Sequence, residues 1–187
     1  MNARSLNRSG VRSWVLVFDT GDEAMAELRR FARTESLSAA QFTGIGAFSR
    51  LVGGYFDWER KDYLRIPIDE QVEVLALTGD VALDGSEPAV HAHVVVGRRD
   101  GSTAGGHLLE GHVRPTLELV VTESPVELRK SYDPRSGLML IDAAPEPAGE
   151  AALPRVPEES LAGRQARRVV EHEQVPRSSS EEGGGAR

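Results

Sequence analysis

Alternation of apolar and polar side chains, with a period of two residues, is the feature that most constrains the fold of this sequence. The clearest example is QVEVLALTGDV at residues 71–81. Because successive side chains of a strand point to opposite faces of a sheet, this pattern predicts strands that bury one face. Other strand-like segments are found at residues 14–18, 41–48, 51–58, 63–67, 89–97, 116–122, 126–132 and 138–141.

One segment has a helical period instead. Residues 22–36 (DEAMAELRRFARTES) place Met25, Leu28 and Phe31 on one side at helical spacing. Acidic side chains at the start of this segment favour the positive end of the helix dipole, and we expect the N-cap among residues 19–21. Many strands with one or two helices predict an α+β domain with a mostly antiparallel sheet. Turns between strands are predicted at the Asp-Gly and Ser-Gly pairs 84–85, 100–101 and 136–137.

Composition divides the chain near Ala143. Residues 143–187 are rich in Pro, Ala, Gly and Glu and contain no aromatic residue. Such a segment cannot bury enough apolar surface to offset its ordering entropy, so we expect a disordered tail, with a short helix conceivable at 158–170. Residues 1–13 are expected to be a flexible N-terminus. The predicted domain is therefore residues 14–142.

Charge is unevenly distributed along the sequence. The 187 residues include 22 Lys+Arg and 29 Asp+Glu, a formal net charge of −7. Residues 14–142 alone hold 13 basic and 21 acidic side chains, so the predicted domain is the acidic part. A protein that binds nucleic acid through phosphate contacts needs a basic face, which this balance disfavours. The basic pairs Arg98-Arg99 and Arg129-Lys130 could form a local patch, but solvated strand ends explain them more simply.

The chain contains no cysteine. Disulfides, thiolate metal sites and cysteine nucleophiles are therefore excluded, and any metal must be held by His and carboxylate ligands. No run approaches the ~18–20 consecutive apolar residues of a membrane span. The N-terminus also lacks the apolar segment of a secretory signal. We therefore expect a cytoplasmic protein without membrane association.

Histidines cluster in one short stretch. His91 and His93, in VHAHVVV, are two residues apart on a predicted strand, so both point to the same face. His107 follows two glycines on the predicted partner strand, and a hairpin turning at 99–102 brings it within a residue or two of the position opposite His93. Three convergent imidazoles with an open fourth position suit Zn²⁺, or Ni, Co, Mn or Fe. The site is thus predicted to hold a divalent metal or a small ligand.

Other candidates for chemistry are weaker. His112 is either a fourth ligand or, as we favour, an exposed strand-end residue, and His172 lies in the predicted tail. Glu110 and Glu118 are candidates for proton transfer, and Glu118 could also orient an imidazole, although such residues more often face water. Gly105-Gly106 predicts a bulge, a positive φ or a close backbone approach to a ligand.

Other catalytic signatures are lacking in the sequence. It has no phosphate-binding GxxxxGK[ST] loop and no GxSxG nucleophile elbow. The GIGA at 44–47 has no following helix, which disfavours a dinucleotide site. The catalytic residues, if the protein is an enzyme, are therefore unknown at this point.

The sequence contains FTGIGAF at 42–48, VEVLALTGDV at 72–81, HAHVVV at 91–96, DGSTAGGHL at 100–108 and TLELVV at 116–121. These five segments, in this order, resemble the PPC ("plants and prokaryotes conserved") domain family. The resemblance implies an antiparallel sheet of about seven strands, assembly as a homotrimer, and in some prokaryotic members a metal site drawn from the HxH and GGH motifs. Those motifs correspond here to His91, His93 and His107.

The resemblance also implies two further properties. In the plant proteins the segment matching 71–79 is tied to partner interactions. Members are often labelled DNA-binding, but that label derives largely from the Arg-Gly-Arg-Pro AT-hook of the plant proteins, which this sequence lacks.

Three functions remain open from the sequence. The first is a small homotrimeric protein whose His cluster binds a metal or small ligand. The second is a DNA-associated transcriptional regulator. The third is a metal-dependent hydrolase or lyase, in which a metal-bound water would be activated near neutral pH.

Overall fold

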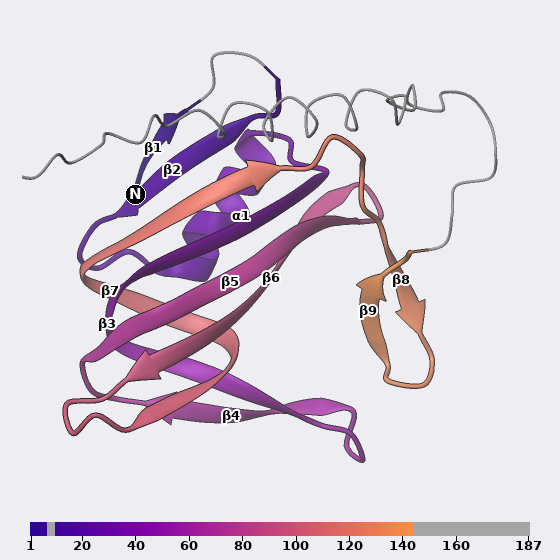
Figure 1. Ribbon diagram of the computed structural model, residues 1–187. Coiled ribbons are helices and arrows are strands. Elements are labelled where there is room, and N and C mark those ends of the chain that lie inside the picture. The colour runs from indigo at the N-terminus through magenta and orange to yellow at the C-terminus, as the bar shows by residue number, and fades with distance from the viewer. Residues whose placement is uncertain (7–9, 144–187) are drawn as a thin grey trace, which may run out of the picture. The chain divides into compact units, whose positions relative to one another are not determined.

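The computed structural model describes residues 1–6 and 10–143, which contain one large sheet, one helix and a separate hairpin (Figure 1). The sheet has seven strands, and all pairings between named strands are antiparallel. This confirms the predicted α+β class with a mostly antiparallel sheet. The elements are β1 (Asn2–Ser5), β2 (Ser13–Phe18), α1 (Ala24–Thr34), β3 (Ala39–Asp57), β4 (Asp62–Ile68), β5 (Val72–Asp84), β6 (Glu87–Gly97), β7 (Thr103–Glu123), β8 (Lys130–Asp133) and β9 (Leu138–Ile141).

Two long strands organise the sheet. The strand order is β1-β2-β7-β6-β5-β3-β4, and β7 pairs additionally with β3. Because β3 pairs with β5, β5 with β6, β6 with β7 and β7 again with β3, these four strands form a closed ring of hydrogen-bonded neighbours. The closure brings the start of β7 between β6 and the second half of β3, and the three-histidine cluster lies there.

The prediction of two separate strands at 41–48 and 51–58 is wrong, because both belong to the continuous strand β3. The glycines that indicated a break instead allow β3 and β7 to approach each other. A Cβ on Gly46, whose φ is +156°, would lie 2.4 Å from the Thr116 carbonyl oxygen. The register also shifts between Gly44 and Gly46, so the strand bends there without ending.

Helix α1 packs its apolar side against β6 and β7. Its buried side chains include Met25, Leu28 and Phe31, as the helical spacing predicts. The predicted N-cap at residues 19–21 is wrong: Glu23 caps the helix, and its carboxylate accepts hydrogen bonds from the backbone N–H groups of Met25 and Ala26. The same carboxylate accepts a hydrogen bond from the Gly111 N–H at 2.9 Å, which ties the start of the helix to β7.

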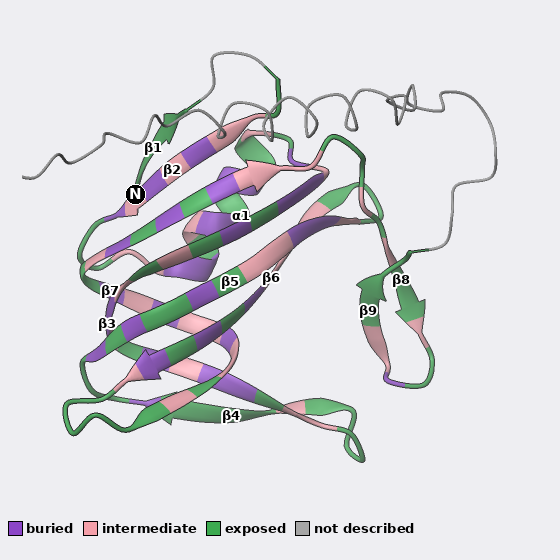
Figure 2. Cartoon of the chain, in the orientation of Figure 1, coloured by how far each residue is buried: buried purple, intermediate pink, exposed green. Residues whose placement is uncertain are grey.

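The core is formed by the apolar side of α1 and the buried face of the sheet. Alternating strand positions are buried, which is visible as a purple and green alternation along β5, β6 and β7 (Figure 2). Fully buried side chains include Leu16, Phe18, Phe48, Leu77 and Leu117. The complementary positions of the same strands point outward, and those on β6 include two of the candidate histidines.

Short strands lie near both ends of the described residues. Residues 2–5, within the segment expected to be flexible, form β1 and pair with β2. Residues 138–141, expected to close the core, pair with β8 in a separate two-stranded hairpin, and Leu140 and Ile141 are exposed. The predicted tail lies outside the described residues from 144 onward. Within the described ranges, no helix is long and apolar enough to cross a membrane.

Candidate metal centre

Strand β6 presents His91 and His93 on one face of the sheet. Ala92 and Val94, the residues that alternate with them, are buried in the core. His91 is half-buried and His93 is exposed. The period-two prediction for these two histidines therefore agrees with the fold.

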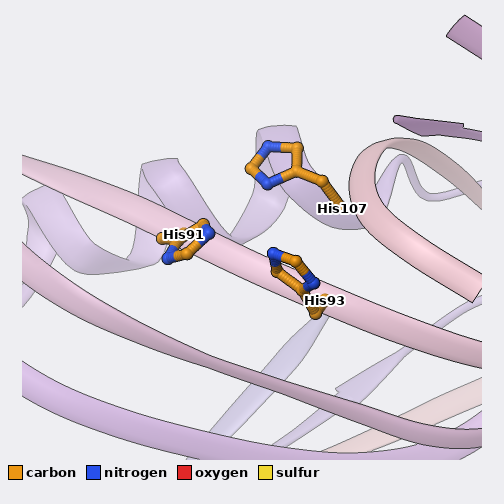
Figure 3. A group of neighbouring side chains, drawn as sticks. All are labelled: His91, His93 and His107. Carbon is orange, nitrogen blue, oxygen red and sulfur yellow. The ribbon is translucent and has the colours of Figure 1, made fainter. Parts of the chain in front are cut away.

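His107 reaches the same place from β7. The hairpin between β6 and β7 turns at 98–102, where the Arg98 N–H donates to the Ser102 carbonyl oxygen at 2.8 Å. With this turn, His107 lies directly opposite His93 in the register, within the one or two residues expected. Figure 3 shows the two imidazoles of β6 and the one of β7 turned toward a common space.

The three rings are close enough to share one ligand. One nitrogen from each of His91, His93 and His107 lies within 4.8 Å of the others. The His91 and His107 rings are stacked at a centroid distance of 5.1 Å, and His93 meets His107 edge-on at 5.4 Å. The structure thus brings all three predicted residues together.

Glycines before His107 make this arrangement possible. Gly106 has a φ of +155°, and a Cβ at this position would lie 2.7 Å from the Gly54 carbonyl oxygen of β3. A Cβ on Gly105 would lie equally close, at 2.7 Å, to the Val94 carbonyl oxygen of β6. The pair therefore lets β7 run in close contact with both neighbouring strands, which agrees with the predicted positive φ.

Two further residues contact the histidines and were missed in the sequence. Asp80 of β5 lies opposite His91 in the register, and its Oδ2 is 3.2 Å from His91 Nδ1. The Asp84-Gly85 turn could have indicated this contact, because a hairpin that turns there pairs Asp80 with His91. Tyr63 of β4 stacks on His107 at a centroid distance of 4.5 Å. No local pattern indicated Tyr63, because the contact spans three strands.

The local environment lowers the pKa of two of the imidazoles, those of His93 and His107. Burial, followed by repulsion from His91 and His93, lowers the pKa of His107 to about 4. Burial and the proximity of His91 also lower the pKa of His93, while Asp80 acts in the opposite direction. Neutral imidazole is the form that ligates a metal, so His107 and His93 are available as ligands near neutral pH.

The donor set fits a divalent metal ion. His107 Nδ1 is buried and has no hydrogen-bond partner among the described residues, a cost that a bound cation or ligand donor would remove. Three imidazoles with a carboxylate behind one of them match the ligand and outer-partner pattern of Zn²⁺ sites with an open position. Such an ion would supply a Lewis acid and a vacant coordination position.

The remaining candidates lie outside this group. His112 is a half-buried residue within β7, not a strand end, and its Nε2 is 3.3 Å from a guanidinium nitrogen of Arg50. Glu110 forms an ion pair with Arg65. Glu118 is exposed and lies opposite Ile45, nine positions along β3 from the partner of His107. Glu118 is not among the residues whose ligand atoms converge with those of the histidines.

The chain is similar to a known domain family and to a characterised relative. Residues 6–125 match the model of the Plants and Prokaryotes Conserved (PCC) domain. The bifunctional protein GlmU of Synechococcus sp. (strain JA-3-3Ab) is 31% identical over 150 residues, which cover 80% of this chain. The chain spans only 23% of that relative's length.

Solved structures share the fold. A plant- and prokaryote-conserved (PPC) protein of Pyrococcus horikoshii is 31% identical with a TM-score of 0.67, covering 77% of this chain and 96% of that one. A metal-containing protein of Archaeoglobus fulgidus is 32% identical with a TM-score of 0.64, covering 69% and 91%. A Bacteroides thetaiotaomicron protein, named as a candidate DNA-binding protein, is 26% identical with a TM-score of 0.70, covering 75% and 96%. The family match, the motif order and the fold agree. The chain belongs to the Plants and Prokaryotes Conserved domain family, abbreviated PCC or PPC.

Proposed function

We propose that this protein binds a divalent metal ion, Zn²⁺ being the first candidate, through His91, His93 and His107. The observation that carries the proposal is the convergence of three imidazole nitrogens within 4.8 Å. The metal-containing neighbour from Archaeoglobus fulgidus supports it, because that chain is similar over 91% of its length. The open coordination position would accept water or an oxygen of a small ligand.

Equilibrium dialysis followed by elemental analysis tests the proposal. The wild-type chain is expected to retain about one metal ion per protomer, and the double variant H91A/H93A is expected to retain none. H112A is the matched control, because His112 lies on β7 like His107 but outside the three-histidine group. Equal retention by wild type and H91A/H93A would refute the site, as would the absence of metal from both.

We also propose that the protein assembles as a homotrimer. Large apolar side chains are exposed on the outer face of the ring strands, which supports burial against other copies. Ile45 and Leu75 are 63% and 51% exposed and line one surface pocket of about 580 Å³. Sedimentation equilibrium tests this, with L75E expected to shift the mass toward the monomer. A monomeric wild type would refute it.

DNA binding is the second candidate, favoured by the name of the Bacteroides thetaiotaomicron neighbour. The charges oppose it, because Arg98 pairs with Glu70 and Arg129 pairs with Glu127, so one member of each basic pair is neutralised by an acid. A duplex DNA titration at several salt concentrations distinguishes the two functions. Binding through phosphates would weaken steeply with salt, and no binding at low salt would leave the metal function alone.

A further inference from the structure

We propose that Asp80 and Tyr63 are positioning residues that hold two of the three imidazoles before any metal binds. Asp80 orients His91, and Tyr63 orients His107. The role of this orientation in metal binding rests on the proposed function. The orientation itself is a property of the metal-free protein. It is therefore testable without a metal.

The Asp80 contact selects one tautomer of His91. The carboxylate oxygen Oδ2 is 3.2 Å from His91 Nδ1, and a carboxylate only accepts hydrogen bonds. The His91 ring therefore donates from Nδ1–H, which leaves the lone pair on Nε2. A neutral imidazole needs such a lone pair to ligate a metal.

The backbone holds Asp80 against His91. A Cβ on the preceding residue, Gly79, would lie 2.1 Å from the His91 carbonyl oxygen and 2.3 Å from the Phe42 ring. Only glycine permits this close approach of β5 to β6. The approach occurs at the residue next to the Asp80–His91 pair, so it keeps the carboxylate within reach of the imidazole.

The Asp80 contact is not explained by fold stability. Its other oxygen, Oδ1, is buried with no hydrogen-bond partner among the described residues, and the side chain is 28% exposed. An unsatisfied buried carboxylate oxygen costs free energy. This cost is explained by the site, because the same carboxylate contacts the ring of a candidate ligand through Oδ2.

Tyr63 contacts the ring of His107. The two rings are stacked at 4.5 Å with an interplanar angle of 29°. Gly54 of β3 lies opposite His107 in the register, and a Cβ there would approach Tyr63 Cδ1 to 2.9 Å. Phe56 packs edge-on against Tyr63 at 5.3 Å. The Tyr63 ring is thus held in place and defines the plane of the His107 ring.

His93 is the remaining imidazole. It is exposed, and no hydrogen bond to another described residue holds it. Two ligands with preset orientation and one free to adjust reduce the ordering cost of binding, because rotamer freedom is lost mainly at one side chain. The three histidines thus have different roles: His91 and His107 are held in orientation, and His93 adjusts to the ion.

Nitrogen NMR of the metal-free protein tests the Asp80 arm, with the His91 signals assigned by comparison with H91A. The wild type is expected to show His91 in the single tautomer protonated at Nδ1. D80A should convert it to a mixture, and D80N should restore the tautomer because its amide oxygen still accepts. The control D84N alters an exposed acid on the same strand. An unchanged tautomer in D80A would overturn this arm.

Proton NMR of the same metal-free samples tests the Tyr63 arm. Stacking on Tyr63 is expected to shift the His107 ring protons upfield by ring current. Y63L should reduce this shift, leaving the part that the neighbouring imidazoles cause, and Y63F should preserve it. Y55L changes an aromatic residue that is 64% exposed and serves as control. Equal His107 shifts in wild type and Y63L would overturn this arm.

Zn²⁺ titration against a chromophoric chelator then measures the consequence. D80A and Y63L are each expected to weaken Zn²⁺ affinity by about 10–100-fold, and D80N and Y63F by much less. Wild-type affinity in both D80A and Y63L would overturn the positioning role. If wild type binds no Zn²⁺ while the NMR results hold, the proposed function fails and the orientation of the imidazoles stands.

Discussion

His93 of β6 and His107 of β7 occupy directly opposite positions in the sheet register, with their ring centroids 5.4 Å apart. His91, two residues from His93, lies on the same face. The three-histidine group therefore depends on the register of one hairpin. A slip of one residue would turn one partner toward the core and separate the imidazoles.

Replacing Gly106 by alanine is predicted to disrupt this register. The φ of +155° is unfavourable for alanine, and its Cβ would meet the Gly54 carbonyl oxygen at 2.7 Å. We expect the free energy of unfolding to fall by about 2–3 kcal/mol, as measured by urea denaturation. G53A is the control, because its Cβ would make only ordinary contacts at 3.7 Å. Equal stability of the two variants would contradict the prediction.

Zn²⁺ is predicted to stabilise the folded chain through His107. At a free concentration of 100 times Kd, a ligand that binds only the native state adds about 2.7 kcal/mol to the free energy of unfolding. Urea denaturation with Zn²⁺ and with a chelator should differ by this amount in wild type. The difference should disappear in H107Q and persist in H112Q. A difference that survives in H107Q would assign the stabilisation to another site.

The metal-free protein is predicted to lose stability as the pH falls from 7 to 5. The pKa of His107 is lowered from 6.5 to about 4 in the folded state, so the unfolded chain binds a proton in this range and the folded chain does not. The lowered pKa of His93 acts in the same direction. The loss is expected to be on the order of 1–2 kcal/mol at pH 5.

Urea denaturation of wild type and H107Q at both pH values measures this effect. H107Q should lose less stability than wild type, because the titrating group is gone. The range above pH 5 avoids the ordinary pKa values of carboxylates, about 4. An equal loss in the two proteins would exclude His107 as its source.

Removing the Glu23 carboxylate is predicted to destabilise both the helix and its attachment to the sheet. The side chain accepts hydrogen bonds from the Met25, Ala26 and Gly111 N–H groups at 3.2, 2.7 and 2.9 Å. E23A should lower the free energy of unfolding by about 1–2 kcal/mol. The control E27A removes only a helix-surface ion pair with Arg30 and should cost about 0.5 kcal/mol or less. Thermal denaturation compares the two.

Much of the candidate site could be predicted from local pattern. The placement of His91 and His93 on one face follows from the period of two in a strand. The position of His107 follows from the turn at residues 98–102, which sets the pairing of β6 with β7. Both inferences depend on residues close together in the sequence, where strand geometry and turn chemistry leave few alternatives.

Other parts could not be predicted, because they depend on strands distant in the sequence. Gly44 and Gly46 indicate a break when read alone, but they belong to a continuous strand that β7 approaches closely. Glu23 is the N-cap because its carboxylate also reaches the Gly111 N–H. The stacking of Tyr63 on His107 requires β4, β3 and β7 to lie side by side.

The sequence by itself determined the strand-rich α+β class, the apolar side of the helix and the three histidines of one hairpin, since each follows from short-range periodicity. Only the tertiary structure decided which groups surround those histidines. The ring closed by β3 and β7 places Asp80 against His91 and Tyr63 against His107, and it leaves Glu118 outside the group of converging ligand atoms. The physical reason is that Asp80 and Tyr63 come from other strands than the histidines that they contact. Backbone pairing brings these strands together, and glycines at the contacts permit the close approach.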